Sequence, residues 1–573
     1  MSMILRVRNR RRIQAVAGAV TALLAAAACS TVGAAGPGAG SGGSGGSGSG
    51  DSGHVILTVV GNTGGPQPKD FNPYLPTSGI NALWGAAGMI YEPLAQQNSV
   101  KPSINYPWLA KSWAWTNDNK TLTFHLQSGV TWSDGKPFSS ADVAFTFNML
   151  KKNPQINTGG ITFDTVSAPD PKTVVMNFKT PSFTQFYYIA EAAYIVPKHI
   201  WAHVSNPATY QNLKPVGTGP FMLSSFQPSS MLLTKNPHYW QPGLPKIYGL
   251  RYVQYSSNTT ALEDQESGII DWAGGPIPDG QKLYVDRAPQ YNHFWYPANG
   301  IVSILPNQHV WPLNMVAVRK AISLAIDRQQ ISKVGENGYE PPVVSATGLL
   351  LPNYASQLDP KYAGAKLTQD VAAAKRVLQQ AGFKLDSNGV MALNGREIKL
   401  TLGDPSGFVD YMTDDQVIAK ELKDIGIAVT VRGLSTNGWE SDIATGNFDM
   451  TLCWSQSGDI YYILDSILDY KLSGPIGKSA SGDYERWNDP ETQALLTQYQ
   501  TAPTAAGRQQ ALSGLEGVMV SKVPVIPVVG ASDWGSYSTR KVTGFPSPDN
   551  PYDAATAGTP NGEVVALHLV PRK

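Results

Sequence analysis

The chain has little cysteine and no surplus of charge of either sign. Its 573 residues include only two cysteines, Cys29 and Cys453, far apart in the sequence, which excludes a disulfide framework and a cysteine zinc site. Lysine and arginine number 44 against 43 aspartates and glutamates, a balance that argues against a nucleic-acid-binding protein. With 42% hydrophobic and 15% charged residues, the chain can bury a large core and is neither disordered nor fibrous.

The sequence also lacks the motifs of familiar catalytic sites. The pattern Gly-x-Ser-x-Gly occurs only inside a Gly/Ser-rich stretch, and no His-Glu-x-x-His is present. Residues 477–479 (Gly-Lys-Ser) resemble the end of a phosphate loop, but Leu472 stands where that loop needs glycine. Asp414-Asp415 lie at the predicted start of a helix, where the macrodipole accounts for two carboxylates. We therefore expect no catalytic residue, no cofactor and no metal.

Residues 1–28 have the three parts of a secretory signal. An arginine-rich start is followed by an apolar stretch over 15–24 and by small residues that end at Cys29. This end resembles a bacterial lipobox, with Leu24 one or two places earlier than the usual leucine and Ala26 third before the cysteine. The resemblance implies that Cys29 is lipidated. An uncleaved anchor helix is the alternative, although the apolar run is short for a bilayer core of about 30 Å.

Residues 29–53 are rich in glycine and serine and nearly free of bulky side chains. Such a segment behaves as a flexible coil. A lipid followed by a flexible tether holds a soluble domain close to a membrane. We therefore expect an extracytoplasmic protein that is lipid-anchored to the outer face of the cytoplasmic membrane. Removal of the five arginines of the signal leaves 39 basic and 43 acidic residues, a net charge of −4.

From residue 54 onward the hydrophobic patterns are those of a mixed α/β protein. Apolar and β-branched residues predict a first strand within 54–60, and period-two alternation predicts strands over 120–126 and 172–178. Apolar residues at three- and four-residue spacing, with caps at the ends, predict helices over 140–150, 316–331, 370–381 and 413–425, the last leading to a strand over 427–431. No repeat of about 20–50 residues is present, which excludes a solenoid or propeller.

The most specific motif is residues 132–143, WSDGKPFSSADV. It combines a tight Asp-Gly turn, a proline-fixed extended step and a capped helix start. It resembles the signature of the family 5 extracellular solute-binding proteins, which serve oligopeptide and dipeptide ABC importers. Further segments resemble landmarks of this family in the same order: 72–75 (NPYL), 91–94 (YEPL), 109–113 (LAKSW), 217–221 (GTGPF), 236–240 (NPHYW), 268–271 (GIID), 318–321 (VRKA), 325–328 (AIDR) and 523–527 (VPVIP).

The resemblance implies a two-lobed fold of the periplasmic-binding-protein kind (the large cluster C type), with an extra subdomain inserted in the first lobe. Lobe I is expected to comprise residues 54–85, 216–298 and 528–573, the inserted subdomain 86–215, and lobe II 299–527. The ligand is enclosed between the lobes, which close on it by rigid-body motion. The implied partners are the permease subunits of an ABC importer. The protein is expected to be a monomer and to perform no chemistry itself.

The ligand class is less well determined. In oligopeptide-binding relatives a tryptophan is followed three residues later by an aspartate, whose carboxylate pairs with the peptide's α-ammonium group. Here Trp454 is followed at that position by Ser457, which cannot supply a formal charge in a closed cleft. Asp459 lies two residues further on. It either replaces the missing aspartate or is an ordinary turn residue after glycine.

The carboxyl-terminal segments 534–537, 544–546 and 550–552 are similar to those of family members that bind oligosaccharides, and flat aromatic rings suit sugars. Oligopeptides remain the leading ligand class and oligosaccharides the alternative; nickel chelates, haem or another small solute come after these. A secreted hydrolase and a signalling receptor domain are the competing functions. The candidate ligand-binding residues are Trp454, Asp459, Ser457, Trp84, Asn81, Tyr461 and Trp534, with Tyr537 as a further ring for sugars; Cys453 is expected to be a buried small hydrophobe.

Overall fold

The computed structural model describes residues 54–573 except 61–65, 76–86, 102–103, 158, 276, 456–457 and 559–560. The predicted signal, Cys29 and the tether lie outside the described residues. Three larger sheets organise the described chain, with seven, four and five strands.

The seven-stranded sheet joins segments from both ends of the chain. Its order is β12-β21-β11-β1-β10-β9-β8, and its central strand β1 runs parallel to both β10 and β11. Leu57 and Val59 of β1 are fully buried in the largest core cluster. The strands are β1 (Ile56–Val60), β8 (Phe221–Gln227), β9 (Ser230–Lys235), β10 (Gly249–Val253), β11 (Trp272–Ala273), β12 (Asn292–Trp295) and β21 (Gly535–Ser538).

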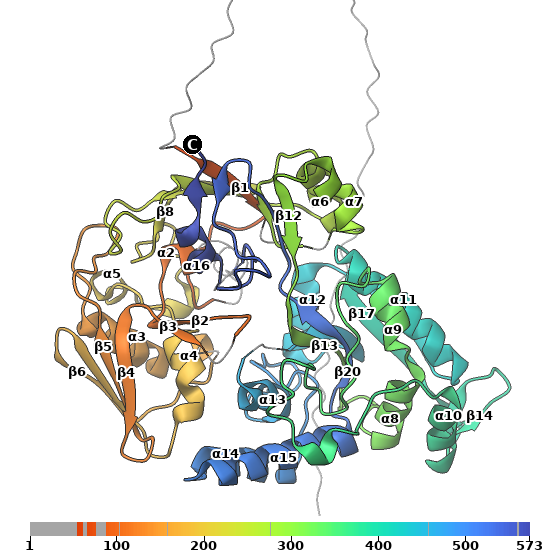
Figure 1. The fold of residues 1–573 in the computed structure, drawn as a ribbon. Helices are drawn as coiled ribbons and strands as arrows, with labels where there is room; N and C mark the ends of the chain where they lie inside the picture. Colours follow the sequence, from red (N-terminus) through yellow and green to blue (C-terminus); the bar gives the residue numbers. More distant parts are fainter. Residues whose placement is uncertain are drawn as a thin grey trace, which may run out of the picture. The chain divides into compact units, whose positions relative to one another are not determined.

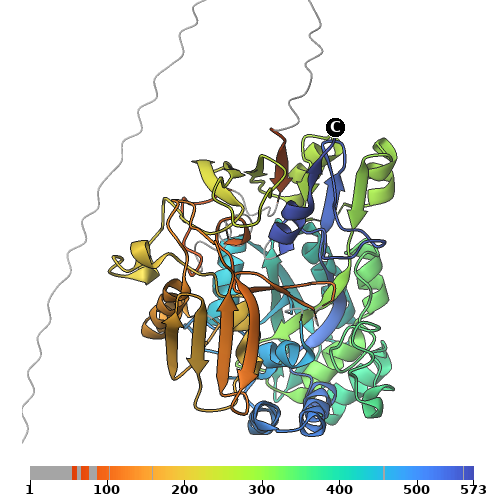
Figure 2. The ribbon, with the colours of Figure 1, turned by 60° about the vertical axis from the view of Figure 1, so that its left-hand side comes forward.

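The four-stranded sheet is antiparallel, in the order β4-β5-β7-β6 (orange to gold in Figure 2). The alternation of polar and apolar residues places Leu122 and Phe124 in the core. The ring of Phe186 on α4 lies 5.2 Å from that of Trp113. The elements are β4 (Ala110–Thr116), β5 (Thr121–Leu126), β6 (Thr165–Asp170), β7 (Thr173–Asn177), α3 (Ser140–Lys152), α4 (Phe186–Ala190) and α5 (Lys198–Trp201).

The five-stranded sheet has the order β18-β17-β19-β13-β20 and carries helices on both faces (Figure 1). Successive residues of β13 point to opposite faces, so that Val302 and Ile304 join one core cluster and Ile301 and Leu305 another. The strands are β13 (Ala298–Pro306), β17 (Lys399–Pro405), β18 (Ala428–Leu434), β19 (Met450–Trp454) and β20 (Ile526–Ser532).

The helices around this sheet fall into two groups by the cluster to which they contribute. One group is α8 (Val316–Ala325), α9 (Arg328–Val334), α10 (Val371–Gln380) and α11 (Val409–Asp424). The other group is α12 (Thr436–Thr445), α13 (Ile460–Leu468), α14 (Pro490–Thr501) and α15 (Ala505–Lys522).

The remaining elements are short or stand apart from these sheets. They are α2 (Ala87–Ile90), β2 (Ala95–Gln97), β3 (Asn105–Pro107), α6 (Asn258–Glu266), α7 (Gly280–Leu283), β14 (Lys384–Leu385), β15 (Met391–Leu393), β16 (Arg396–Glu397), β22 (Val542–Thr543), α16 (Asn561–His568) and β23 (Val570–Pro571).

Most of the elements predicted from hydrophobic periodicity are confirmed. The strands expected within 54–60, 120–126 and 172–178 are β1, β5 and β7. The helix expected over 140–150 is α3, where Ser139 and Asp142 form a capping box. Asp370 caps α10, as the sequence indicates, by accepting a hydrogen bond from the Ala373 N–H.

Two predictions about helices were wrong. The pattern over 316–331 forms two helices, because Ile326 is extended and Asp327 starts α9 by accepting from the backbone N–H groups of Gln329 and Gln330. Asp414 and Asp415 lie in the second turn of α11, not at its start, and both are fully buried. Burial raises the pKa of both carboxyls, and each faces another buried acid, Glu336 and Asp404 respectively. The macrodipole therefore does not explain this pair.

The expected boundary between residues 527 and 528 falls inside β20. This strand pairs with β13 from Ile526 to Ser532 and belongs to the five-stranded sheet, whereas β21, which begins at Gly535, belongs to the seven-stranded sheet. The change from one sheet to the other therefore occurs at residues 533–534.

Candidate functional site

A cavity of about 90 Å³ opens beside Trp454 on the five-stranded sheet. Ser303 of β13 and Cys453 of β19 form part of its wall. The loop before α14 contributes Glu485, and the four-stranded region contributes Tyr188 from α4. The cavity therefore combines segments that are almost 300 residues apart in the sequence.

Trp454 is the last residue of β19, and it is exposed where the rest of its strand is buried. Its side chain is 45% exposed, whereas Leu452 is fully buried and Cys453 is 7% exposed. One side of the ring is supported by Trp439 of α12, with ring centroids 5.8 Å apart. Because Trp439 packs against one side of the Trp454 ring, the other side provides a flat apolar surface for a ligand.

The mouth of the cavity is aromatic because two helices meet there. The rings of Tyr187 and Tyr188 on α4 lie 4.5 Å and 5.2 Å from the ring of Tyr462 on α13. Burial raises the pKa of all three phenols, so they are neutral hydrogen-bonding groups at neutral pH. The site thus offers rings and hydroxyl groups rather than positive charge.

Asp459 is the N-cap of α13. Its carboxylate accepts a hydrogen bond of 2.8 Å from the Tyr461 N–H, and although the residue as a whole is exposed, desolvation raises the pKa of the carboxyl group. Among the described residues that line the cavity, Asp459 is absent. The second oxygen of the capping carboxylate can still bind a ligand. The ligand role of Asp459 therefore stays a prediction.

The other described candidates do not gather around Trp454. Tyr461 is 3% exposed and stacks on Tyr499 at 4.3 Å, and its hydroxyl accepts a hydrogen bond from Gln500. Trp534 lies 4.8 Å from Tyr296, in the segment between the seven- and five-stranded sheets.

Tyr537, suggested for sugars, is 5% exposed and stacks on Phe545. Cys453 is buried, as predicted. The candidates Asn81, Trp84 and Ser457 lie outside the described residues.

Sequence reasoning missed Glu485, Tyr188 and Tyr462. The paired tyrosines 187–188 and 461–462 are a visible aromatic signal, although nothing in the sequence indicates that they meet. Glu485 has no local signal at all, because its importance depends on burial. It is 1% exposed, and its Oε1 has no hydrogen-bond partner within the described structure.

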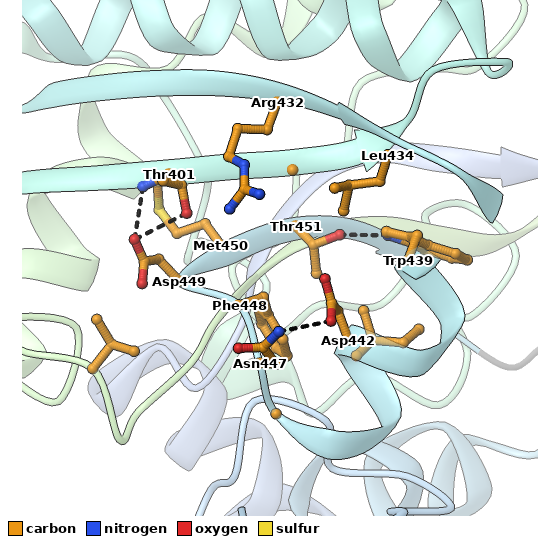
Figure 3. Close-up of a pocket in the computed structure, with 14 residues that line it drawn as sticks. Thr401, Arg432, Leu434, Trp439, Asp442, Asn447, Phe448, Asp449, Met450 and Thr451 are labelled. Atoms are coloured by element: carbon orange, nitrogen blue, oxygen red, sulfur yellow. Dashed lines mark hydrogen bonds between the residues drawn. The ribbon is translucent and has the colours of Figure 1, made fainter. Parts of the chain in front are cut away.

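A second, larger cavity of about 320 Å³ lies between the strands β17 and β18 and the helix α12 (Figure 3). Arg432 points into it from β18, toward the side of the cavity where Asp442 and Asp449 lie. Both carboxylates already have partners: Asp449 accepts from Thr401, and Asp442 from Asn447. Since both carboxylates of this cavity are paired with neighbouring polar side chains, we place the functional site at Trp454 despite the smaller volume there.

Comparison with known proteins identifies the fold and the family. The model of the "Bacterial extracellular solute-binding proteins, family 5 Middle" matches residues 105–471. Protein XP55 of Streptomyces lividans is 31% identical over 352 residues, which is 57% of this chain and 58% of that protein. The oligopeptide-binding protein OppA of Bacillus subtilis is 25% identical over 457 residues, 73% of this chain and 78% of that protein.

Among solved structures, the mannohexaose-bound periplasmic oligopeptide-binding protein of Thermotoga maritima matches with a TM-score of 0.82. The identity is 24%, and the match covers 90% of this chain and 98% of that one. The fold is that of the two-lobed periplasmic binding proteins. The chain belongs to the family 5 bacterial extracellular solute-binding proteins, which confirms the resemblance noted in the sequence.

Two further findings concern membranes and metals. Within the described part of the chain, no helix has the length and apolarity needed to cross a bilayer. No group of three or more His, Cys, Asp or Glu side chains suited to a metal ion occurs among the described residues.

Proposed function

We propose that this protein is the solute-binding component of an ABC importer and that it captures oligopeptides between its two lobes. The observation that carries the proposal is the cavity at Trp454, which is lined by this exposed ring, by the buried Glu485, and by tyrosines of the helices α4 and α13. Aromatic walls accept varied side chains, and a few polar groups fix the orientation of the ligand. The oligopeptide-binding relative OppA supports this ligand class.

An oligosaccharide is the second candidate ligand. The aromatic mouth formed by Trp454, Tyr188 and Tyr462 suits the flat faces of sugar rings as well as peptide side chains. The similar Thermotoga maritima structure contains mannohexaose. Either ligand would be carried without chemical change, so the protein would act as a binding protein and not as an enzyme.

The ligand contacts that we propose centre on Trp454, with Ser457 and Asp459 in the loop that follows it. Asn81, Trp84, Tyr461 and Trp534 remain proposed contacts from the sequence, although Tyr461 is packed in the core of its sheet. A conformational change on ligand binding would be needed to bring Tyr461 to a ligand.

The division into lobes is also a proposal. Lobe I would comprise 54–85, 216–298 and the chain after residue 533, with the inserted subdomain at 86–215. Lobe II would comprise 299–532, because β20 pairs with β13 up to Ser532. The three larger sheets support this division.

We further propose that the protein is a monomer, held at the outer face of the cytoplasmic membrane by a lipid on Cys29. The permease subunits of the importer would be its partners. Radioactive palmitate labelling that disappears in Cys29→Ala tests the anchor. Labelling that persists in the variant would contradict it.

The ligand class is tested by identifying what the protein carries. The full chain is produced in a bacterial host, purified without denaturant in mild detergent and then unfolded, and the released molecules are identified by mass spectrometry. We expect peptides of a narrow length range in the wild type and their loss in Trp454→Ala. Hexose or pentose oligomers would establish the alternative instead. A covalently altered ligand that accumulates with time would contradict a pure binding role.

A further inference from the structure

Glu485 is a buried acidic residue that lines the cavity at Trp454. Its side chain is 1% exposed, and Oε1 has no hydrogen-bond partner within the described residues. It lines the same cavity as Ser303, Cys453 and Trp454. A buried carboxylate oxygen without a hydrogen-bond partner is unfavourable when the group is ionised, because a charge in an apolar environment needs a counter-charge or a proton.

The loop that carries Glu485 contains two residues with positive φ angles. Asp483 and Arg486, on either side of Tyr484-Glu485, have φ angles of 43° and 63°, a region that residues other than glycine seldom adopt. The loop is fixed by two hydrogen bonds, from the Asp483 N–H to the Ser466 carbonyl at 2.7 Å and from the Trp487 N–H to the Asp483 carboxylate at 2.6 Å. Such strain persists where surrounding structure enforces it, and it is common at ligand sites.

The nearest protein cations do not neutralise Glu485 directly. The Arg319 guanidinium donates to the carbonyl oxygens of Val523, Leu313 and Lys522. Arg486 donates to the carbonyls of Ala444 and Tyr484. Burial raises the pKa of Glu485, and a hydrogen bond from its own backbone N–H and the charges of Arg486 and Arg319 only partly oppose this effect. No ion pair found in the described structure includes Glu485.

The cavity has the size and walls for a small cationic group. Its volume of about 90 Å³ is about three times the share of one water in the liquid, about 30 Å³, which suffices for an ammonium group with a short carbon stem. The rings of Tyr188, Trp454 and Tyr462 at its edge attract cations through their faces.

We propose that Glu485 receives a primary ammonium group of the bound peptide, through a charge-assisted hydrogen bond next to Trp454. This inference rests on the proposed peptide-binding function and specifies its selectivity. The carboxylate comes from a segment about 30 residues after Trp454, and it supplies the charge that Ser457 lacks. The ammonium group belongs either to the amino terminus of the peptide or to a lysine-type side chain.

The experiment compares peptide libraries that differ only in their amines. The full chain is stripped of ligand by reversible unfolding and offered an equimolar set of synthetic tri- to octapeptides. Parallel sets carry an acetylated amino terminus, acetylated lysine side chains, or both. Bound peptides are quantified by native mass spectrometry. A set of neutral oligosaccharides of similar mass is tested beside them.

For the wild type we expect one of the acetylations to weaken binding about 10- to 100-fold, the range for loss of a charged hydrogen bond. Loss with the amino-terminal acetyl group assigns the α-ammonium, and loss with side-chain acetylation assigns the lysine-type group. Glu485→Gln should bind free and acetylated sets alike. Glu516→Gln is the matched control and should keep the wild-type discrimination, because Glu516 is a buried carboxyl on α15 that is not among the described residues lining the cavity.

The outcomes separate the two proposals. Peptide binding that is insensitive to acetylation, or a Glu485→Gln variant that discriminates like the wild type, overturns the role of Glu485 and leaves the peptide function intact. Binding of oligosaccharides without any peptide overturns the proposed function itself. The acetylation comparison in the wild type decides whether an ammonium group is recognised, and the comparison of Glu485→Gln with Glu516→Gln decides whether Glu485 is the residue that recognises it.

Discussion

At the scale of single residues, Trp454 differs from its neighbours because its ring is exposed at the end of a buried strand. Scattered exposed apolar residues are normal on protein surfaces. Trp454, however, borders a cavity and is backed by Trp439. The sequence predicts Trp454 as a ligand contact, and the structure places Trp454 at the cavity.

We predict that Trp454→Ala weakens ligand binding at least about 10-fold, since large aromatic anchors commonly contribute more than about 1.4 kcal/mol to binding. The free energy of unfolding should change little, because the ring is 45% exposed. Isothermal titration calorimetry with the released ligand measures the affinity. Tyr470→Ala is the matched control, since Tyr470 is 43% exposed and is not one of the described residues that line the cavity. Equal losses in both variants would contradict a specific role for Trp454.

At the scale of elements, the break between α8 and α9 shows how a polar cap overrides a hydrophobic pattern. The spacing of apolar residues over 316–331 continues without interruption. The Asp327 side chain nevertheless accepts two backbone N–H groups, and Arg328 is buried with its guanidinium on the Pro527 carbonyl. The cap is a local signal, whereas the Arg328 contact depends on a strand about 200 residues away and is invisible in the local pattern.

We predict that Asp327→Ala lowers the free energy of unfolding by about 1 kcal/mol, the usual effect of losing an N-cap. Urea unfolding followed by circular dichroism measures the change. Asp327→Asn should retain most of the stability, because an asparagine side chain also accepts from the backbone N–H groups. A loss of the same size in the asparagine variant would show that capping is not the cause.

At the scale of the whole chain, buried carboxyl pairs link segments distant in sequence. Glu92, just before β2, and Glu563, on α16, are both fully buried. Glu92 accepts hydrogen bonds from Tyr239 and Trp240, and Glu563 accepts from Gln96 and Trp108. Burial raises the pKa of both carboxyls, and their mutual repulsion raises that of Glu563 further.

These raised pKa values make stability fall as pH rises. The folded pair keeps a proton at pH values where the unfolded carboxyls, with an ordinary pKa of 4.5, have lost theirs. The contribution is therefore complete below pH 4.5 and is lost as the pH rises toward the folded pKa. We predict a free energy of unfolding that declines from about pH 5 through the pKa of about 7 that burial gives Glu92, with a shallower decline in Glu563→Gln. Urea titrations at each pH measure both, and an unchanged slope in the variant would contradict the assignment.

The proposed closure of the two lobes is also a property of the whole molecule. The four-stranded region already contacts α13 through Tyr187 and Tyr462, and the Gly280 N–H donates to the Tyr339 hydroxyl between the segments of the proposed lobes. We predict that ligand decreases the radius of gyration in small-angle X-ray scattering and raises the melting temperature by mass action. An unchanged radius with saturating ligand would contradict closure.

By itself, the sequence determined the α/β class, most strands and helices, and the family, because periodicity, caps and turn motifs are local. It also indicated Trp454, which ends an apolar strand. Only the tertiary structure decided which carboxylates are buried, since burial depends on elements hundreds of residues apart. From the sequence alone, Asp414 and Asp415 were therefore placed wrongly at the start of a helix, and Glu485 was not identified. The structure also shows that Asp459 caps a helix and is not among the described residues that line the cavity.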